Sequence, residues 1–410
     1  MVLETTKTDA PPGSGGEEGG APEPLRRRIP VAVRMAIFYA AIFAPLGVSV
    51  PYWPVWLAHK GLGPEKIGAI VAAALVLRVW ANPVIGRIAD RQGARRRILI
   101  ALSWGGFLAT SLYLLVDGFV GILAVALLVS LLVPPQISLT ENTGVLASYQ
   151  RGYDYGRVRL WGSAAFVGGT LLAGLALGLY GAGIVIWLVI AGMAATAVLS
   201  WLLPDVRSPP ATEARGAVRR FLAEPRFLLF LAASSLVNAS HGVFYTFGAL
   251  HWGKAGIDPF WVSVLWSVGV VAEIALFAWS DKVVRLIGPA RLLLFAALGG
   301  MVRWVATAAS DALPVLFVAQ LLHALTFGFC HLGAMHFLAR AAPADLGATA
   351  QGLYSAIGTG LVVALVTALA GPLYAHFGGG AYFAMAGACA FGALAAWALV
   401  VRWKGGVLKI

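Results

Sequence analysis

The sequence carries little charge and almost no cysteine. Only 12% of its 410 residues are Asp, Glu, Lys or Arg, whereas 60% are hydrophobic and the mean hydropathy is +0.82. Soluble domains carry about 25% charged residues, so this composition excludes a soluble globular protein and predicts an all-α polytopic membrane protein. The two cysteines, Cys330 and Cys389, both lie inside apolar segments, which excludes a disulfide framework and predicts two free thiols.

Several chemical signatures are also missing from the sequence. There is no Walker A motif, so ATP is not expected as the energy source, and no His-x-x-x-His or Cys-x-x-Cys pair, so neither a metal site nor a bound cofactor is expected. No nucleophile–base arrangement favours an enzyme, and the lack of a sizeable soluble domain argues against a substrate sensor. The net charge is +12, but the basic residues fall in short loops rather than on one soluble face, so no nucleic-acid partner is expected.

Apolar runs of bilayer length follow one another along the chain. A helix needs about 20 apolar residues to cross the hydrocarbon core, and most of these runs have about 20 to 25. The expected spans are 32–58, 66–88, 97–116, 118–147, 157–180, 183–203, 227–250, 260–280, 290–310, 312–338, 346–376 and 380–402. Because the first run begins only near Val31, no cleavable signal peptide is expected. Twelve spans place both termini on the same side of the lipid bilayer.

Polar stretches divide the chain into two halves. Residues 1–30 are rich in Gly, Pro and Glu and are expected to form a disordered tail. The stretch 204–226 is expected to link a first six-helix bundle, 31–203, to a second, 227–403, which is followed by a short tail, 404–410. Two six-span halves around a midplane site are a common transporter design.

The distribution of positive charge predicts the orientation. Of the 30 Lys and Arg residues, three (Lys60, Lys66 and Lys254) fall in loops on one side and two (Arg78 and Arg303) inside spans, which leaves 25 on the side of the tails. Positive residues concentrate on the cytoplasmic side of a membrane. Both termini are therefore expected to be cytoplasmic, and an Ala-, Gly- and Arg-rich composition suggests a bacterial inner membrane.

A charged stretch, Gly86–Arg97, separates spans two and three. It holds one aspartate and four arginines between Asp90 and Arg97, and Gly86 and Gly93 are expected to allow a tight turn and a close helix approach. The pattern Gly-x-x-x-Asp-Arg-x-Gly resembles the loop between helices two and three of the major facilitator superfamily. The resemblance implies a twelve-helix fold that works by alternating access, with Gly86, Asp90, Arg91 and Gly93 as a conformational latch. A basic hairpin without such a role, as in any polytopic protein, is the alternative.

Few ionisable residues lie inside the spans, and each is costly there, so each is a candidate for function. Glu273 precedes Asp281 by eight residues and Arg303 follows Arg291 by twelve, which puts them about 12 and 18 Å into the membrane. Glu273 and His323 are the expected proton-coupling residues, because a carboxyl and an imidazole can exchange protons as water access changes. A structural Glu–Arg pair remains the alternative, above all for Glu141 and Arg78.

The entry to span five, Tyr155–Ser163, is unusually specific. Arg159 follows Glu141 by 18 residues across one short connection, so the two side chains are expected at similar depth as an ion pair or a shared ligand contact. The segment resembles the start of helix five in the oligosaccharide–proton symporters of the lactose permease type. That resemblance implies sugar binding by Glu141 and Arg159 and assigns Phe166 the place of a stacking aromatic. The family's proton-carrying Glu is Thr326 here, so its proton site does not transfer.

A second resemblance covers most of residues 36–376. Seven pieces of the sequence are similar to the phenylpropionate permease family. They are Tyr52-Trp53-Pro54, Arg78, Asn82-Pro83, the segment His241–Tyr245, the segment Trp266–Glu273, Arg303-Trp304 and the segment His323–Phe327. It implies proton-coupled uptake of a small aromatic carboxylate, with the proton as coupling ion and no other cofactor. The expected substrate-binding residues are Glu141, Arg159, Phe166, His241, Tyr245, Trp266, Arg303 and Phe327. A monomer is expected, and a proton symporter for a neutral sugar or nucleoside remains the alternative.

Overall fold

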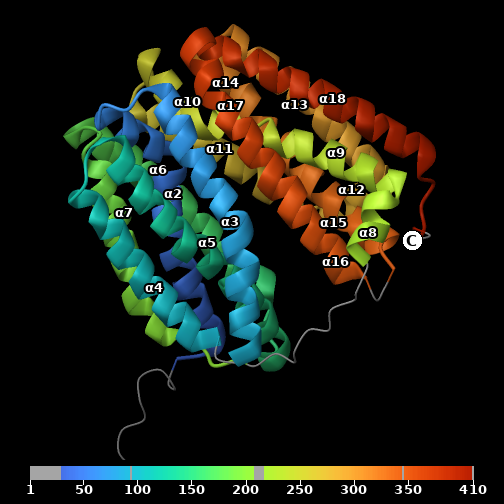
Figure 1. The fold of residues 1–410 in the computed structure, drawn as a ribbon, viewed down its shortest axis with the longest axis horizontal. Coiled ribbons are helices and arrows are strands. Elements are labelled where there is room, and N and C mark those ends of the chain that lie inside the picture. Colours follow the sequence, from blue (N-terminus) through green and yellow to red (C-terminus); the bar gives the residue numbers. More distant parts are fainter. Residues whose placement is uncertain (1–28, 93–94, 207–216, 344–345, 409–410) are drawn as a thin grey trace, which may run out of the picture.

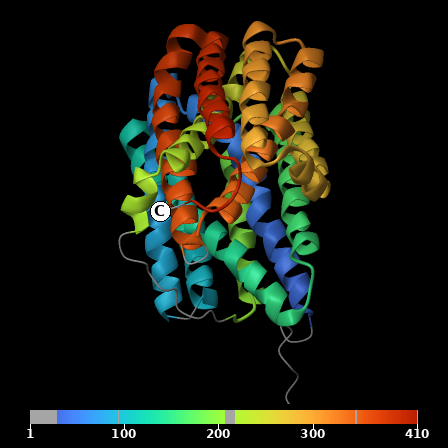
Figure 2. The same ribbon diagram turned by 90° about the vertical axis from the view of Figure 1, so that its right-hand side faces the viewer.

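The computed structural model describes residues 29–92, 95–206, 217–343 and 346–408, and within them the chain is almost entirely helical, without a strand. Gly93 lies outside the described residues, as do parts of the expected tails and linker. The helices form two bundles (Figure 1), and Figure 2 shows the long helices of both running in the same general direction.

The first bundle contains six spans. They are α2 (Val31–His59), α3 (Pro64–Gln92), α4 (Arg95–Ser111) with the 3-10 turn Leu112–Leu114, α5 (Gly118–Arg151), α6 (Tyr155–Tyr180), and α7 (Ile184–Leu199) with the 3-10 turn Ser200–Leu202. The short helix α8 (Ala217–Ala223) lies in the stretch expected to link the bundles.

The second bundle also contains six spans, several of them interrupted. They are α9 (Pro225–Ala239) with α10 (Gly242–Lys254), α11 (Pro259–Ala278) followed by the short α12 (Ser280–Ile287), α13 (Pro289–Ala309), α14 (Leu313–Leu321) with the π-helical turn η3 (Ala324–Phe329) and α15 (Cys330–Ala341), α16 (Gly347–Leu353) with the π-helical turn η4 (Tyr354–Leu361) and α17 (Val362–Phe377), and α18 (Ala381–Arg402).

Eleven helical stretches of the described chain are long and apolar enough to cross a membrane. The last of them, Thr349–Arg402, has 54 residues, too many for one crossing, and reverses at Gly378, whose φ is +53°. It therefore makes two crossings. The expected fold class, twelve transmembrane helices in two six-helix bundles, is confirmed.

Side chains at the helix starts accept the first free backbone N–H groups. Asp154 accepts from the N–H of Arg157 at 3.1 Å, and Asp258 accepts from that of Phe260 at 2.8 Å. Glu224 caps α9 and also accepts from the Arg226 side chain at 2.6 Å. These hydrogen bonds lower the pKa of Glu224, so it stays charged beside the positive end of the helix.

The closest helix crossing of the first bundle is between α2 and α6. A Cβ at Gly47 would lie 2.1 Å from the backbone oxygen of Phe166, and one at Gly169 would lie 2.4 Å from that of Ala44. The hydroxyl of Thr170 donates to the backbone oxygen of Gly47 at 2.7 Å. Small residues thus bring two backbones together, which is how membrane helices gain packing contacts. This crossing fixes Arg159, on α6, against the start of α2.

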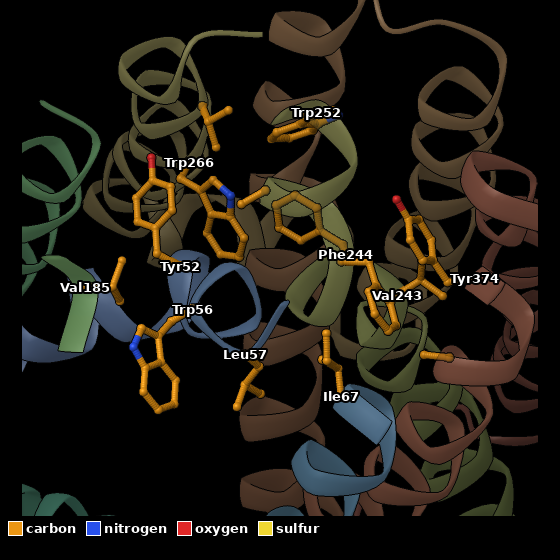
Figure 3. Close-up of a cluster of buried hydrophobic side chains, with 14 of the residues drawn as sticks. Tyr52, Trp56, Leu57, Ile67, Val185, Val243, Phe244, Trp252, Trp266 and Tyr374 are labelled. Atoms are coloured by element: carbon orange, nitrogen blue, oxygen red, sulfur yellow. The ribbon is translucent and has the colours of Figure 1, made fainter. Parts of the chain in front are cut away.

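The two bundles share one apolar core on one side of the membrane only. We call the side on which the described chain begins the tail side, and the opposite side the far side. On the far side, Trp56 and Ile67 of the first bundle belong to the same buried cluster as Phe244, Trp266 and Tyr374 of the second (Figure 3). On the tail side, Phe38 and Phe230 lie in separate clusters, one in each bundle.

Side-chain hydrogen bonds join the bundles at the far side. Tyr52 on α2 donates to the backbone oxygen of Pro259 at 2.7 Å and lies 2.5 Å from the Ser263 hydroxyl. Ser263 in turn donates to the backbone oxygen of Thr170 at 2.7 Å. Together with the divided tail-side cores, these bonds describe a conformation that is closed on the far side and parted on the tail side.

Gly68 of α3 lies against the second bundle, since a Cβ there would lie 2.8 Å from the Cα of Gly371 on α17. A substitution at Gly68 therefore tests whether this contact keeps the far side closed. We expect Gly68→Ala to push the far ends of these helices apart. Spin labels at Lys66→Cys and Ala375→Cys should then show a new population at longer distance. Gly63→Ala is the matched control, since nothing lies within 4 Å of its added carbon. An unchanged distance distribution in Gly68→Ala would show that this contact does not hold the far side closed.

Candidate functional site

The first bundle contributes the ion pair that the sequence predicts. Arg159 Nε lies 2.6 Å from Glu141 Oε1, and the two side chains are 28% and 30% exposed. Tyr39 donates to the other carboxylate oxygen at 3.3 Å, and Tyr155 donates to that oxygen as well. The carboxylate of Glu141 therefore has three protein donors, and the charge of Arg159 is balanced within its own bundle.

Aromatic rings cover the guanidinium of Arg159. Its central carbon lies 4.1 Å from the ring centre of Phe43 and 5.5 Å from that of Tyr39. Sequence reasoning missed Phe43 and Tyr155 as parts of this group. The spacing of Tyr39 and Phe43, one helical turn apart on α2, is the signal that places both rings on one face.

In the second bundle, a fully buried Arg303 is surrounded by neutral groups. Its Nη1 donates to Thr326 Oγ1 at 2.9 Å and lies 3.0 Å from His323 Nδ1 and 3.2 Å from His241 Nε2. Its Nη2 donates to Gln320 Oε1 at 3.1 Å. Thr326, which stands where the lactose permease group carries a Glu, is thus an acceptor for Arg303 rather than a proton carrier.

The hydrogen-bond partners of the two imidazoles decide which of their nitrogens carry hydrogen. A guanidinium only donates, so His323 Nδ1 accepts from it. The backbone oxygen of Val237 can only accept, so His241 Nδ1 donates to it, which leaves His241 Nε2 to accept from Arg303 or from the Thr326 hydroxyl, 3.2 Å away. The proton of His241 then lies on Nδ1, which donates to the backbone oxygen of Val237 at 3.1 Å. The proton of His323 lies on Nε2, which is 3.6 Å from Glu273 Oε2.

Glu273 lies at the outer end of the cluster around Arg303. It faces His323 and so stands one imidazole away from Arg303. The side chain of Glu273 is 20% exposed, so it is the most open member of the Arg303–His323–Glu273 chain.

Around Arg303 the structure has more donors than acceptors. No carboxylate of a described residue lies within ion-pair distance of its guanidinium. Arg303 Nε, Gln320 Nε2 and Trp266 Nε1 are all buried without a hydrogen-bond partner. Buried donors are rarely left unpaired, so the cluster is suited to an acceptor of negative charge from outside the protein.

Aromatic rings line the same region. Phe244 stacks on Trp266 with ring centres 4.4 Å apart, and it also faces the guanidinium of Arg303 at 5.0 Å; Figure 3 shows these two rings side by side. Tyr245 lies 5.4 Å from the ring of His241, and half-buried Phe327 stacks on His323 at 5.5 Å. The structure thus brings together the expected His241, Tyr245, Trp266, Arg303, His323 and Phe327, and adds Phe244 and Gln320.

Breaks in the helices position several of these residues. His241 stands between α9 and α10, with φ −78° and ψ −5°, and His323 precedes the π-helical turn η3 that contains Thr326. Such turns often mark functional sites, because the inserted residue changes where the next side chains point. Nothing in the sequence, such as a proline at either position, indicates these breaks.

Two groups of expected residues lie elsewhere. Phe166 is half-buried on α6, where its backbone oxygen accepts from the Thr170 hydroxyl at 2.9 Å, and its ring makes no ring contact with another described residue. The stretch Gly86–Arg97 was expected to be a loop, but α3 continues to Gln92, so Gly86, Asp90 and Arg91 are helical. The close helix approach expected at Gly86 is absent, since nothing lies within 4 Å of a Cβ added there.

The chain is similar in sequence to known membrane proteins. Residues 32–385 match the MFS_1 like family. A probable 3-phenylpropionic acid transporter of Escherichia coli (strain K12) is 34% identical over 339 residues, which cover 80% of this chain and 86% of that protein. A maltose permease of Geobacillus stearothermophilus is 27% identical, covering 79% of this chain and 83% of that protein.

The fold is also found among solved structures. The nucleoside transporter NupG superposes with a TM-score of 0.78 at 16% identity, covering 92% of this chain and all of NupG, which shows likeness of fold alone. The family match extends over most of the chain and agrees with the twelve-helix architecture. This chain is therefore a multi-pass membrane protein that belongs to the MFS_1 like family, among the transporters of the major facilitator superfamily.

Proposed function

We propose that this protein is a proton symporter that imports a small aromatic carboxylate, such as a phenylpropionate-like acid, by alternating access. The observation that carries the proposal is the fully buried Arg303, which has neutral acceptors but no carboxylate partner among the described residues. A buried charge without a counter-charge is costly, and a substrate carboxylate would remove that cost. The relative that is 34% identical is named for such an acid.

The unpaired donors indicate how the carboxylate binds. Arg303 Nε and Gln320 Nε2 are both free to donate, and Arg303 and Gln320 already lie within hydrogen-bond distance of each other. A carboxylate has two oxygens and can accept from both. The aromatic ring of the substrate would then rest against Phe244, Tyr245 and Trp266, where ring contacts add to apolar packing.

Charge balance supports coupling to a proton. Without substrate, the positive Arg303 and the negative Glu273 stand on either side of a neutral His323. Adding one carboxylate and one proton leaves the net charge of this group unchanged. A group that is withdrawn from water tolerates this joint loading far better than an added anion alone. Glu273 and His323 are the residues proposed to hold the proton.

The orientation of the chain belongs to the same proposal. Both termini are taken as cytoplasmic, in a bacterial inner membrane, because positive residues gather on the tail side. The observed conformation, parted on the tail side, is then open to the cytoplasm and corresponds to substrate release. In this scheme Gly86, Asp90 and Arg91, near the cytoplasmic end of α3, form a latch together with Gly93, and the latch engages when that side closes.

A symporter for a neutral sugar or nucleoside is the second candidate. Glu141 and Arg159 lie together, with the hydroxyls of Tyr39 and Tyr155 beside the carboxylate, a set of donors and acceptors that suits hydroxyl groups. The relative that is 27% identical is named for maltose. The first candidate is favoured because Arg159 is already neutralised, whereas Arg303 is not.

Uptake into proteoliposomes tests the proposed function. With an inward pH gradient, acid outside, labelled 3-phenylpropionate should accumulate above its external concentration, because each entering proton supplies free energy. Maltose and uridine serve as comparison substrates under the same gradient. Accumulation that persists after a protonophore collapses the gradient would rule out proton coupling. Accumulation of maltose or uridine in place of the acid would favour the second candidate.

Glu273→Gln tests the proton carrier. The amide keeps the shape of the side chain but cannot exchange a proton, so uphill uptake should be lost while exchange of labelled for unlabelled substrate continues. Glu65→Gln, on an exposed residue at the far end of α3, is the matched control and should leave uptake unchanged. Full uphill uptake by Glu273→Gln would remove Glu273 from the mechanism.

Arg303→Lys tests the two-pronged contact with the carboxylate. Lysine keeps the charge but lacks the Nε–H group proposed to donate to one carboxylate oxygen while Gln320 donates to the other, so the affinity for 3-phenylpropionate should fall by about tenfold or more. Arg285→Gln, on the exposed face of α12, is the control for loss of an arginine outside the site. Binding can be followed by isothermal titration calorimetry on the purified protein, and equal affinities of Arg303→Lys and wild type would exclude this role.

A further inference from the structure

The first bundle contains a cavity of about 270 Å³ that the proposed mechanism does not use. Five helices form its walls, all of them in the first bundle, so it is separate from the Arg303 cluster. Its lining is mostly apolar. The residues on which the argument depends are Ser49, Trp53, Arg78, Tyr113 and Ser130.

Arg78 is the charged residue in the lining of this cavity. It is the central residue of α3, which runs from Pro64 to Gln92, so about 21 Å of helix separates it from either end. Its side chain is exposed and lines the cavity, whereas Val76 and Trp80, which are 40% and 70% exposed, form an exposed apolar stripe on another face of α3. Each is two residues from Arg78 and so points about 200° away around the helix.

This arginine has no partner in the structure. Arg78 makes no hydrogen bond, ion pair or ring contact with any described residue, unlike Arg159 with Glu141 and Arg303 with its four neutral acceptors. The Glu–Arg pair that remained an alternative for Arg78 is therefore not observed. Charged residues at this depth pair with another group or mark a ligand path, because an isolated charge there is costly.

The remaining walls offer apolar and aromatic surface but few free polar groups. Trp53 and Tyr113 lie with ring centres 4.7 Å apart at the cavity. The hydroxyl of Ser130 already donates to a backbone oxygen of its own helix at 2.8 Å, and that of Ser49 makes a weaker contact of the same kind at 3.5 Å. A ligand for this cavity needs one negative group for Arg78 and an apolar body for the rest.

We infer that this cavity is a second binding site for a monocarboxylate with one aromatic ring, whose carboxylate pairs with Arg78 and whose ring lies toward Trp53 and Tyr113. The volume lies near the lower end, about 300 Å³, of the range for small-molecule pockets, so it suits one ring with a short chain rather than a disaccharide. The ligand class rests on the proposed function, whereas the site itself rests on the unpaired Arg78 and the cavity beside it.

Protection of an introduced thiol tests the site without relying on transport. Both native cysteines are fully buried, so Ser49→Cys supplies a reporter in the cavity for a maleimide reagent. We expect 3-phenylpropionate to slow labelling, and 3-phenylpropanamide, its neutral analogue, to need about tenfold higher concentration for the same protection. Ala255→Cys, in the exposed loop between α10 and α11, should be labelled at the same rate with or without ligand.

Substitution of each arginine then assigns the binding group. With Arg78→Gln added, acid and amide should protect Ser49→Cys equally; with Arg303→Lys added, the preference for the acid should remain. Ser130→Cys is the second reporter if Ser49→Cys fails to fold. Equal protection by acid and amide in the protein that retains Arg78, or a preference lost only with Arg303, would overturn the inference. Protection without any uptake would refute the proposed function alone, and uptake without protection would refute the cavity site alone.

Discussion

A charged side chain inside a membrane span must be balanced, and this constraint governs three arginines of the described helices. Arg159 is balanced by Glu141 on the neighbouring helix. Arg303 is held by neutral acceptors, with Glu273 one imidazole away. Arg78 faces a cavity and has no partner among the described residues. The three sites differ in how much negative charge the protein itself places near the arginine. A bound carboxylate would supply the negative charge that the protein does not.

The irregular backbone of the second bundle follows from the same constraint. Arg303 needs several acceptors on one side, and a regular helix places successive side chains on different faces. The break before α10 turns His241 toward the guanidinium, and the π-helical turn η3 does the same for Thr326. Non-helical backbone at membrane depth is tolerated only where protein or water surrounds it. These two helix interruptions thus lie next to Arg303 and supply two of its hydrogen-bond partners.

The sequence predicted the features of this protein that depend on residues near one another in the chain. The lengths of the apolar runs predict the twelve spans, and the 18-residue separation of Glu141 and Arg159 across one short connection predicts their ion pair. Contacts between distant helices were not predictable, because they depend on how each helix is rotated about its axis. Phe43, Gln320 and the unpaired state of Arg78 all fall in that class. The roles of the predicted site residues stay predictions.

Charge counting connects the proposed site to the proposed transport cycle. The group of Arg303 and Glu273 has zero net charge when empty, and again when it holds both a carboxylate and a proton. With only the proton it carries one positive charge, and with only the carboxylate one negative charge. Closing the tail side would withdraw this group from water, where an unbalanced charge is costly. The states that hold only the proton or only the carboxylate would therefore close least readily. A symporter needs this difference, because it must cross between its two conformations either empty or with both substrate and proton bound.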